Sequence, residues 1–179
     1  PWNLGTAVNV QQMVFGNTGD RSGTGVAFSR NNVTGERGEP FGDFLINAQG
    51  EDVVAGIRTP RPLIELRDEL PEAFAQLIET MGLLERTYHN MQDVEFTIED
   101  GRLYMLQTRN GKRSAPAMVR IAVEMADEGL VTSDEALRDL VDPGQIRQLL
   151  LPQLDADNAS QPVARGVNAS PGAASGGIV

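Results

Sequence analysis

The chain has 179 residues, no cysteine and a single histidine, so thiol chemistry, disulfide scaffolds and histidine-rich metal sites are excluded. Its 25 acidic residues outnumber its 15 basic residues, and the net charge of −10 argues against binding to nucleic acid or to an anionic membrane. No window approaches the roughly 18 apolar residues that a membrane span needs. With 40% hydrophobic residues, the composition is that of an ordinary globular domain.

Neither end of the chain resembles a natural terminus. The sequence begins Pro1-Trp2-Asn3, without an initiator methionine or a signal peptide, and it ends on the apolar pair Ile178-Val179. We therefore expect a piece excised from a longer cytoplasmic protein.

The first part of the chain predicts short strands around a glycine-rich loop. Residues 16–25 hold four glycines, which favour turns and unusual φ angles. This loop matches neither a P-loop nor a dinucleotide fingerprint, so a tight β-connection is as good an interpretation as phosphate binding. The predicted strands are residues 8–15, 26–28, 44–48 and 52–57, with a turn at 31–35.

Two helices are predicted next. Pro62 opens a short one that ends near Leu70. Residues 71–88 predict a longer one, because apolar side chains recur with the spacing of a single helix face. That stripe consists of Phe74, Leu77, Ile78, Met81, Leu84 and Tyr88. We interpret it as core packing rather than as a cofactor site, and His89 just beyond it as a surface or helix-end histidine.

An antiparallel hairpin is predicted between residues 91 and 109. Residues 91–98 alternate between apolar and polar side chains, which indicates a strand with one packed face. Asp100-Gly101 is a strong turn signal, and residues 102–109 return as the partner strand. The packed face would carry Val94, Phe96 and Ile98, and the polar face Asp93, Glu95 and Thr97.

The length of the turn decides which side chains share the polar face. A two-residue loop would place Glu95 opposite Leu106, whereas a three-residue loop with a bulge would place Glu95 opposite Gln107 and Asp93 opposite Arg109. We prefer the three-residue loop. It gathers two carboxylates, an amide and a guanidinium on one face and leaves Leu106 on the packed face.

The chemistry of such a cluster suits a metal–nucleotide complex. Carboxylate and amide oxygens are hard ligands for Mg²⁺, and a guanidinium matches a phosphate. Together they could stabilise charge during phosphoryl transfer. Judged from the pattern alone, cross-strand salt bridging on a solvated sheet face is the simpler interpretation.

The remainder of the chain is predicted to be helical and then linker-like. Helices are expected over residues 115–128, 132–141 and 143–151. Thr132 and Glu135 form a candidate capping box at the start of the second helix. From Asp155 onward the chain is rich in Ala, Gly, Ser, Asn and Pro, which predicts a linker that leads into another domain.

Several runs of residues point to one known family. They are QMVFGN (12–17), SGTGVAFSRN (22–31), GDFLINAQGEDVVAGIRTP (42–60), DVEFT (93–97), MLQTRNGKR (105–113), VRIAVEM (119–125) and ASPGAA (169–174). Together these segments resemble the pyruvate, phosphate dikinases. The long run 42–60 is the most specific, and it fits a dikinase better than a phosphoenolpyruvate synthase.

The resemblance implies a function and a domain organisation. These enzymes convert ATP, phosphate and pyruvate into AMP, diphosphate and phosphoenolpyruvate through a phosphohistidine. An ATP-grasp domain, a swivelling phosphohistidine domain and a pyruvate-binding barrel share one chain, which we expect to form a homodimer. We therefore expect an α+β fold, with residues 1–112 as the C-terminal ATP-grasp subdomain, an antiparallel sheet with helices. Residues 113–161 would be a helical linker and 162–179 the start of the phosphohistidine domain, and the piece alone would be inactive.

The resemblance also implies roles for individual residues. Glu95 and Gln107 would hold Mg²⁺, Asp93 would be their acidic neighbour, and Arg109 would contact phosphate. The adenine hinge would be formed by Gln11, Gln12, Met13 and Val14, with Glu51 and Asp52 near the nucleotide. Two other interpretations stay open. One is a phosphoenolpyruvate synthase-like phosphotransferase, and the other is a non-catalytic module whose helices mediate docking or dimerisation.

Overall fold

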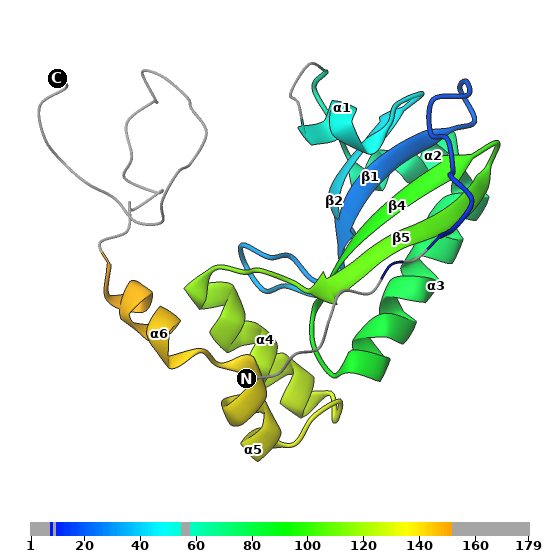
Figure 1. Ribbon diagram of the computed structural model, residues 1–179. Helices are drawn as coiled ribbons and strands as arrows, with labels where there is room; N and C mark the ends of the chain where they lie inside the picture. Colours follow the sequence, from blue (N-terminus) through cyan, green and yellow to red (C-terminus); the bar gives the residue numbers. More distant parts are fainter. Residues whose placement is uncertain (1–7, 9, 55–57, 152–179) are drawn as a thin grey trace, which may run out of the picture. The chain divides into compact units, whose positions relative to one another are not determined.

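The computed structural model describes residues 8, 10–54 and 58–151, and these confirm an α+β fold. Among them, five strands form one sheet in the order β3-β2-β1-β4-β5 (Figure 1). The strands are β1 (Gly23–Phe28), β2 (Phe41–Ile46), β3 (Arg61–Pro62), β4 (Gln92–Glu99) and β5 (Arg102–Asn110). The short edge strand β3 runs antiparallel to β2, with Phe44 opposite Arg61.

Helical segments follow the strands in two groups. The first group is α1 (Gly50–Val54), η1 (Leu63–Glu65), α2 (Leu66–Glu69) and α3 (Pro71–Tyr88). The second is α4 (Ala115–Asp127), α5 (Ser133–Glu135), the π-helical turn η2 (Ala136–Leu140), α6 (Pro143–Ile146) and η3 (Arg147–Leu150). No helix among the described residues is long and apolar enough to cross a membrane.

The contacts divide the chain into two compact units. Unit 1 takes its described residues from Pro1–Ala27, Gly42–Glu79 and Val94–Thr108, and unit 2 takes its own from Phe28–Phe41, Thr80–Asp93 and Arg109–Val179. The strands β1, β2, β4 and β5 and the helix α3 each contribute residues to both units.

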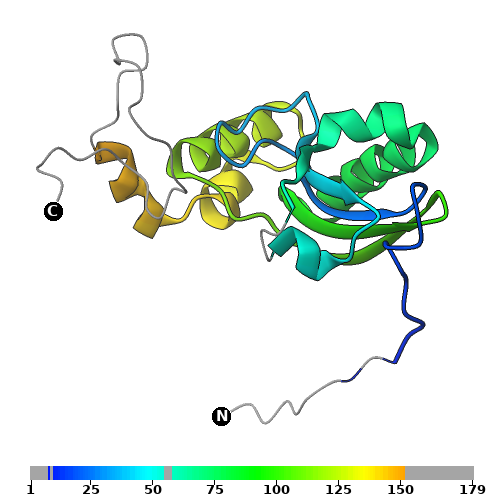
Figure 2. The ribbon, with the colours of Figure 1, turned by 90° about the horizontal axis from the view of Figure 1, so that it is seen from above.

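Unit 1 has an apolar core between its strands and the first half of α3. Within this unit α3 lies along one face of the sheet (Figure 2). Phe96 and Ile98 of β4 are at most 1% exposed, and Leu77 of α3 is fully buried. At Gly25 in β1, an added Cβ would lie 2.5 Å from the carbonyl oxygen of Asp43, so the strands approach too closely there for any side chain.

Helix α3 has the bounds that the sequence predicts. Pro71 opens it with a preset φ angle, and His89 directly after it has the left-handed φ of 52° that ends a helix. Phe74, Leu77 and Met81 are buried as expected, but Tyr88 is 55% exposed, so including it in the buried stripe was wrong. His89 is an exposed helix-end residue, as predicted.

Two predicted strands are wrong and one is shifted. Residues 8 and 10–15 form no strand, and the side chains of Val8 and Val10 are 80% and 96% exposed, so no neighbour buries the apolar pattern. Residues 50–54 form the helix α1, because the Asp52 carboxylate accepts a hydrogen bond from the Gln49 N–H at 2.8 Å and caps the first turn. The strand predicted at 44–48 is found at Phe41–Ile46, and residues 55–57 lie outside the described part.

Unit 2 is built around α4. Ser114 accepts a hydrogen bond from the Ala117 N–H and caps α4, and Gly129 ends it with a φ of 72°. The fully buried Met91, Ile121 and Met125 belong to one apolar cluster in this unit. The predicted capping box of Thr132 and Glu135 is confirmed.

Some expectations fall on residues that the structure does not describe. They are the linker beyond residue 151, the matching run 169–174 and the predicted phosphohistidine segment 162–179. The predicted domain boundaries stay predictions.

Candidate functional site

The hairpin turn is shorter than we predicted. Strand β4 ends at Glu99 and β5 begins at Arg102, so only Asp100 and Gly101 form the loop. Their φ angles of 46° and 80° are those of a type I′ turn, which Asp-Gly favours because its twist matches that of the strands. The preference for a three-residue loop was therefore wrong. Leu106 is 47% exposed, so placing it on the packed face was wrong as well.

The predicted pair Asp93–Arg109 is nevertheless found, at the other end of the hairpin. A two-residue turn without a bulge would place Met91 opposite Asn110, yet the Gly111 N–H donates to the Met91 carbonyl at 2.8 Å. Strand β5 therefore carries one extra residue, a bulge, before this point. The prediction put the extra residue in the turn, whereas the structure puts it within the strand.

Asp93 and Arg109 form an ion pair in unit 2. The Arg109 Nε donates to Asp93 Oδ2 at 2.7 Å, with the carboxylate almost buried and the guanidinium side chain 51% exposed. A buried carboxylate thus orients a guanidinium that still faces solvent. This arrangement suits an arginine that contacts an anionic ligand.

Glu95 and Gln107 lie in unit 1 on the neighbouring strands β4 and β5. Glu95 is half-buried and Gln107 is exposed. Neither side chain has a hydrogen-bond or ion-pair partner within the described part of the chain. Their oxygens are therefore available to an external ligand, and hard oxygen donors of this kind fit Mg²⁺.

A metal held here would need ligands from outside the protein. Among the described residues, no group of three or more histidine, aspartate or glutamate side chains could hold a metal ion. Mg²⁺ commonly takes one or two protein ligands and completes its shell with phosphate oxygens and water. The donor set therefore fits a magnesium–nucleotide complex better than a metal held by protein side chains alone.

The predicted hinge residues line a cavity in unit 1. Its volume is about 240 Å³, and we call it the hinge cavity. It is lined by Gln11, Gln12, Met13, Val14, Glu99, Tyr104, Met105 and Leu106. The structure thus brings the four sequence-predicted residues together with the two strands of the hairpin. Their adenine-binding role stays a prediction.

Glu51 and Asp52 occupy the helix α1. The Asp52 carboxylate is engaged by the Gln49 N–H, and Glu51 is exposed. A local capping role therefore accounts for Asp52, and a nucleotide role for either residue stays a prediction.

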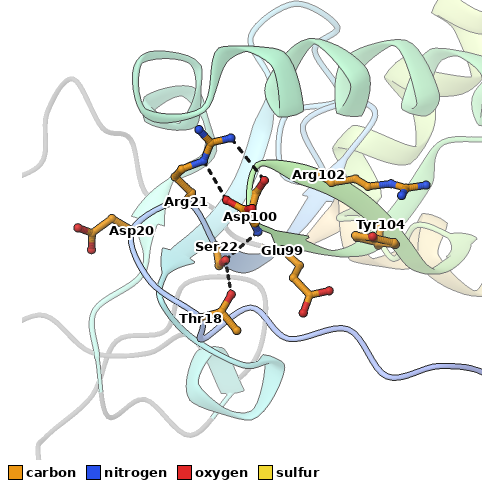
Figure 3. A pocket seen from close by; sticks show the side chains of 8 residues that line it. All are labelled: Thr18, Asp20, Arg21, Ser22, Glu99, Asp100, Arg102 and Tyr104. Carbon is orange, nitrogen blue, oxygen red and sulfur yellow. Dashed lines mark hydrogen bonds and ion pairs between the residues drawn. The ribbon is translucent and has the colours of Figure 1, made fainter.

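A second cavity was not foreseen from the sequence. It measures about 760 Å³ and lies where the glycine-rich loop meets the hairpin turn (Figure 3). We call it the turn cavity, and it is lined by Thr18, Asp20, Arg21, Ser22, Glu99, Asp100, Arg102 and Tyr104. The only advance signal was the glycine-rich loop itself, which gave no indication of where it would dock.

Hydrogen bonds hold the glycine-rich loop to the hairpin turn. The Gly101 N–H donates to the Arg21 carbonyl at 2.7 Å, and the Asp100 N–H donates to Ser22 Oγ at 2.9 Å. Arg21 also pairs with the Asp100 carboxylate at 3.1 Å. The loop is therefore a structural β-connection that also forms one wall of the turn cavity.

The sequence of the chain matches that of a class of ATP-binding domains. The chain matches the sequence model described as "Pyruvate phosphate dikinase, AMP/ATP-binding domain" over residues 2–71 and 63–130, and it belongs to this family. It is 51% identical to the pyruvate, phosphate dikinase of Clostridium symbiosum and 52% identical to that of Rhizobium meliloti (strain 1021). It is 54% identical to pyruvate, phosphate dikinase 2 of Zea mays.

These comparisons confirm the resemblance on which the sequence analysis rested. The alignments cover 99%, 100% and 98% of this chain, but only 20%, 21% and 20% of the three relatives. The chain therefore spans about a fifth of the length of the relatives it matches.

Proposed function

We propose that this chain is the ATP-binding portion of a pyruvate, phosphate dikinase about five times its length. The full-length enzyme would convert ATP, phosphate and pyruvate into AMP, diphosphate and phosphoenolpyruvate through a phosphohistidine. Family membership and the three relatives support this proposal. A swivelling phosphohistidine domain and a pyruvate-binding barrel in the same chain, a homodimer and a cytoplasmic location belong to the proposal as well.

The hinge cavity is the observation that carries it. Met13, Val14 and Leu106 offer apolar surface to a flat base. The backbone groups of residues 11–14 make no hydrogen bond within the described part of the chain, so they are available to the edge of the base. A cavity that combines apolar side chains with polar side chains and with unused backbone donors and acceptors fits adenine.

The strands that line the cavity also carry the proposed phosphate end of the site. Glu99 of the hinge cavity and Glu95 are four residues apart on β4, about 13 Å at the spacing of a strand. Glu95 and Gln107 would hold Mg²⁺, which when bound would neutralise charge on the triphosphate. Arg109, oriented by Asp93, would contact a phosphate oxygen.

Catalysis would then rest on positioning and electrostatics. In the full-length enzyme, the β-phosphoryl group of ATP would pass to a histidine of the swivelling domain. The residues of this chain would fix the triphosphate and stabilise the charge that develops on it, without forming a covalent bond to it.

The test is a quenched assay of the full-length protein with ATP and pyruvate. The proposal predicts diphosphate release that requires added phosphate. Diphosphate-free turnover that yields phosphate from ATP, with water as the second acceptor, would instead support a synthase. Absence of any ATP-dependent turnover would favour a docking module and contradict the proposal.

A further inference from the structure

Glu99 is one of two residues that line both the hinge cavity and the turn cavity. It closes β4, and its side chain is half-buried. Tyr104 is the other residue that the hinge cavity and the turn cavity share. Glu99 therefore stands where the small cavity proposed for the base meets a larger cavity of similar polarity.

The Glu99 carboxylate has no partner within the part of the chain that the structure describes. The nearby cations are engaged elsewhere: Arg21 pairs with Asp100 at 3.1 Å, and the Arg102 guanidinium lies 5.1 Å from the centre of the Tyr104 ring. Figure 3 shows the Glu99 side chain pointing away from the Arg21–Asp100 pair. A half-buried carboxylate without a protein partner is available to accept hydrogen bonds from a ligand.

The chemistry of this carboxylate restricts the group that it can bind. An ionised carboxylate only accepts hydrogen bonds, so it needs donors and repels phosphate. In a nucleotide whose base occupies the hinge cavity, the vicinal ribose hydroxyls are paired donors that match two carboxylate oxygens. Acidic side chains bind ribose hydroxyls in this way in other nucleotide folds.

We infer that Glu99 binds the ribose hydroxyls of the nucleotide and makes the site selective for ribonucleotides. This inference rests on the proposed function, because it needs a nucleotide in the hinge cavity. The contact is thereby assigned to Glu99, the carboxyl-terminal residue of β4, which the sequence patterns did not indicate. The contact also fixes the direction of the nucleotide, since the triphosphate must lie away from Glu99 and toward Glu95.

Equilibrium binding of ATP, 2′,3′-dideoxy-ATP and GTP to the full-length protein tests the inference. Wild type should bind ATP roughly ten- to a hundredfold more tightly than dideoxy-ATP, the range for hydrogen bonds to a charged group. In Glu99→Ala this ratio should fall close to one, and in Glu99→Gln it should lie between. The control Asp20→Asn removes an exposed carboxylate that lines only the turn cavity, and it should keep the wild-type ratio.

The other possible outcomes contradict either the ribose contact or the proposed function. An unchanged ratio in both Glu99 variants, with ATP still bound, would overturn the ribose contact. A change in the ATP to GTP ratio alone would assign Glu99 to the base and overturn it too. If wild type binds no nucleotide, the proposed function fails and this inference fails with it. Should Glu99→Ala not fold, the isosteric Glu99→Gln decides.

Discussion

Two groups of acidic side chains, one in each unit, are used in opposite ways. In unit 2, the fully buried Arg30 pairs with Glu85 at 2.8 Å, with Glu128 at 2.7 Å and with Glu124 at 3.4 Å. In unit 1, Glu95 and Glu99 have no partner among the described residues. The comparison teaches that unit 2 commits a cluster of its carboxylates to one buried arginine, whereas unit 1 leaves two half-buried carboxylates unpaired, as the proposed nucleotide site requires.

The physical chemistry of Arg30 shows how fully these charges are committed. Burial alone would lower the pKa of Arg30, but the hydrogen bonds and charges of Glu85 and Glu128 outweigh it and raise the pKa. Glu85 is itself only 3% exposed and also accepts a hydrogen bond from Ser29 Oγ. Removing one member of such a cluster leaves a buried charge uncompensated.

The largest expected effect is the loss of stability when Arg30 is removed from the ion-pair cluster of unit 2. Arg30→Met should lower the free energy of unfolding by about 3–5 kcal/mol, because it leaves Glu85 buried without its cation. Urea unfolding of the 179-residue chain measures it. The control Arg37→Met removes a half-exposed cation from Glu128 and should cost no more than about 1 kcal/mol. Equal losses in the two variants would show that the buried pair of Arg30 and Glu85 contributes no more to stability than an exposed pair.

A smaller effect concerns a surface carboxylate of unit 2. Hydrogen bonds from the backbone and side chain of Thr132 lower the pKa of Glu135 below its ordinary value of 4.5. A depressed pKa means that the stabilisation is present above the ordinary value and is lost as pH falls through the folded value. Thr132→Ala should cost about 1 kcal/mol at pH 7, typical of a lost helix cap.

The pH series separates this cap from a general loss of stability. The difference in unfolding free energy between wild type and Thr132→Ala should shrink as pH is lowered from 7 to 3. A difference that stays constant over this range would mean that the Glu135 carboxylate contributes nothing to the cap.

Local patterns predicted the helices after residue 62 but not the helix α1. Helix α3 has the predicted bounds because its periodicity, its initial proline and its left-handed terminus all lie within one segment. The caps at Ser114 and Thr132 are local as well. Strands depend on partners that are distant in sequence, and the prediction at 8–15 failed for that reason. The strand predicted from residue 52 failed because a local cap starts a helix there instead.

Residue spacing alone foresaw the candidate site only within the hairpin, and the family resemblance added residues 11–14. The Asp93–Arg109 pair was predicted, although the extra residue lies within β5 and not in the turn. Glu99 could not be found in the same way, because its exposure and its lack of a partner depend on where residues 11–22 meet the hairpin. No residue spacing in the sequence predicts where residues 11–22 lie against the hairpin.

The most direct test of the account is the effect of Mg²⁺ on ATP affinity in the full-length protein. The central claim is that the unpaired Glu95 carboxylate of unit 1 serves a metal-bound nucleotide. Mg²⁺ should tighten ATP binding to wild type, and Glu95→Gln should reduce this gain roughly tenfold or more, as changes around metal sites do. Glu79→Gln, an exposed carboxylate on α3, should leave the gain unchanged. An equal Mg²⁺ effect in wild type and Glu95→Gln would contradict the account.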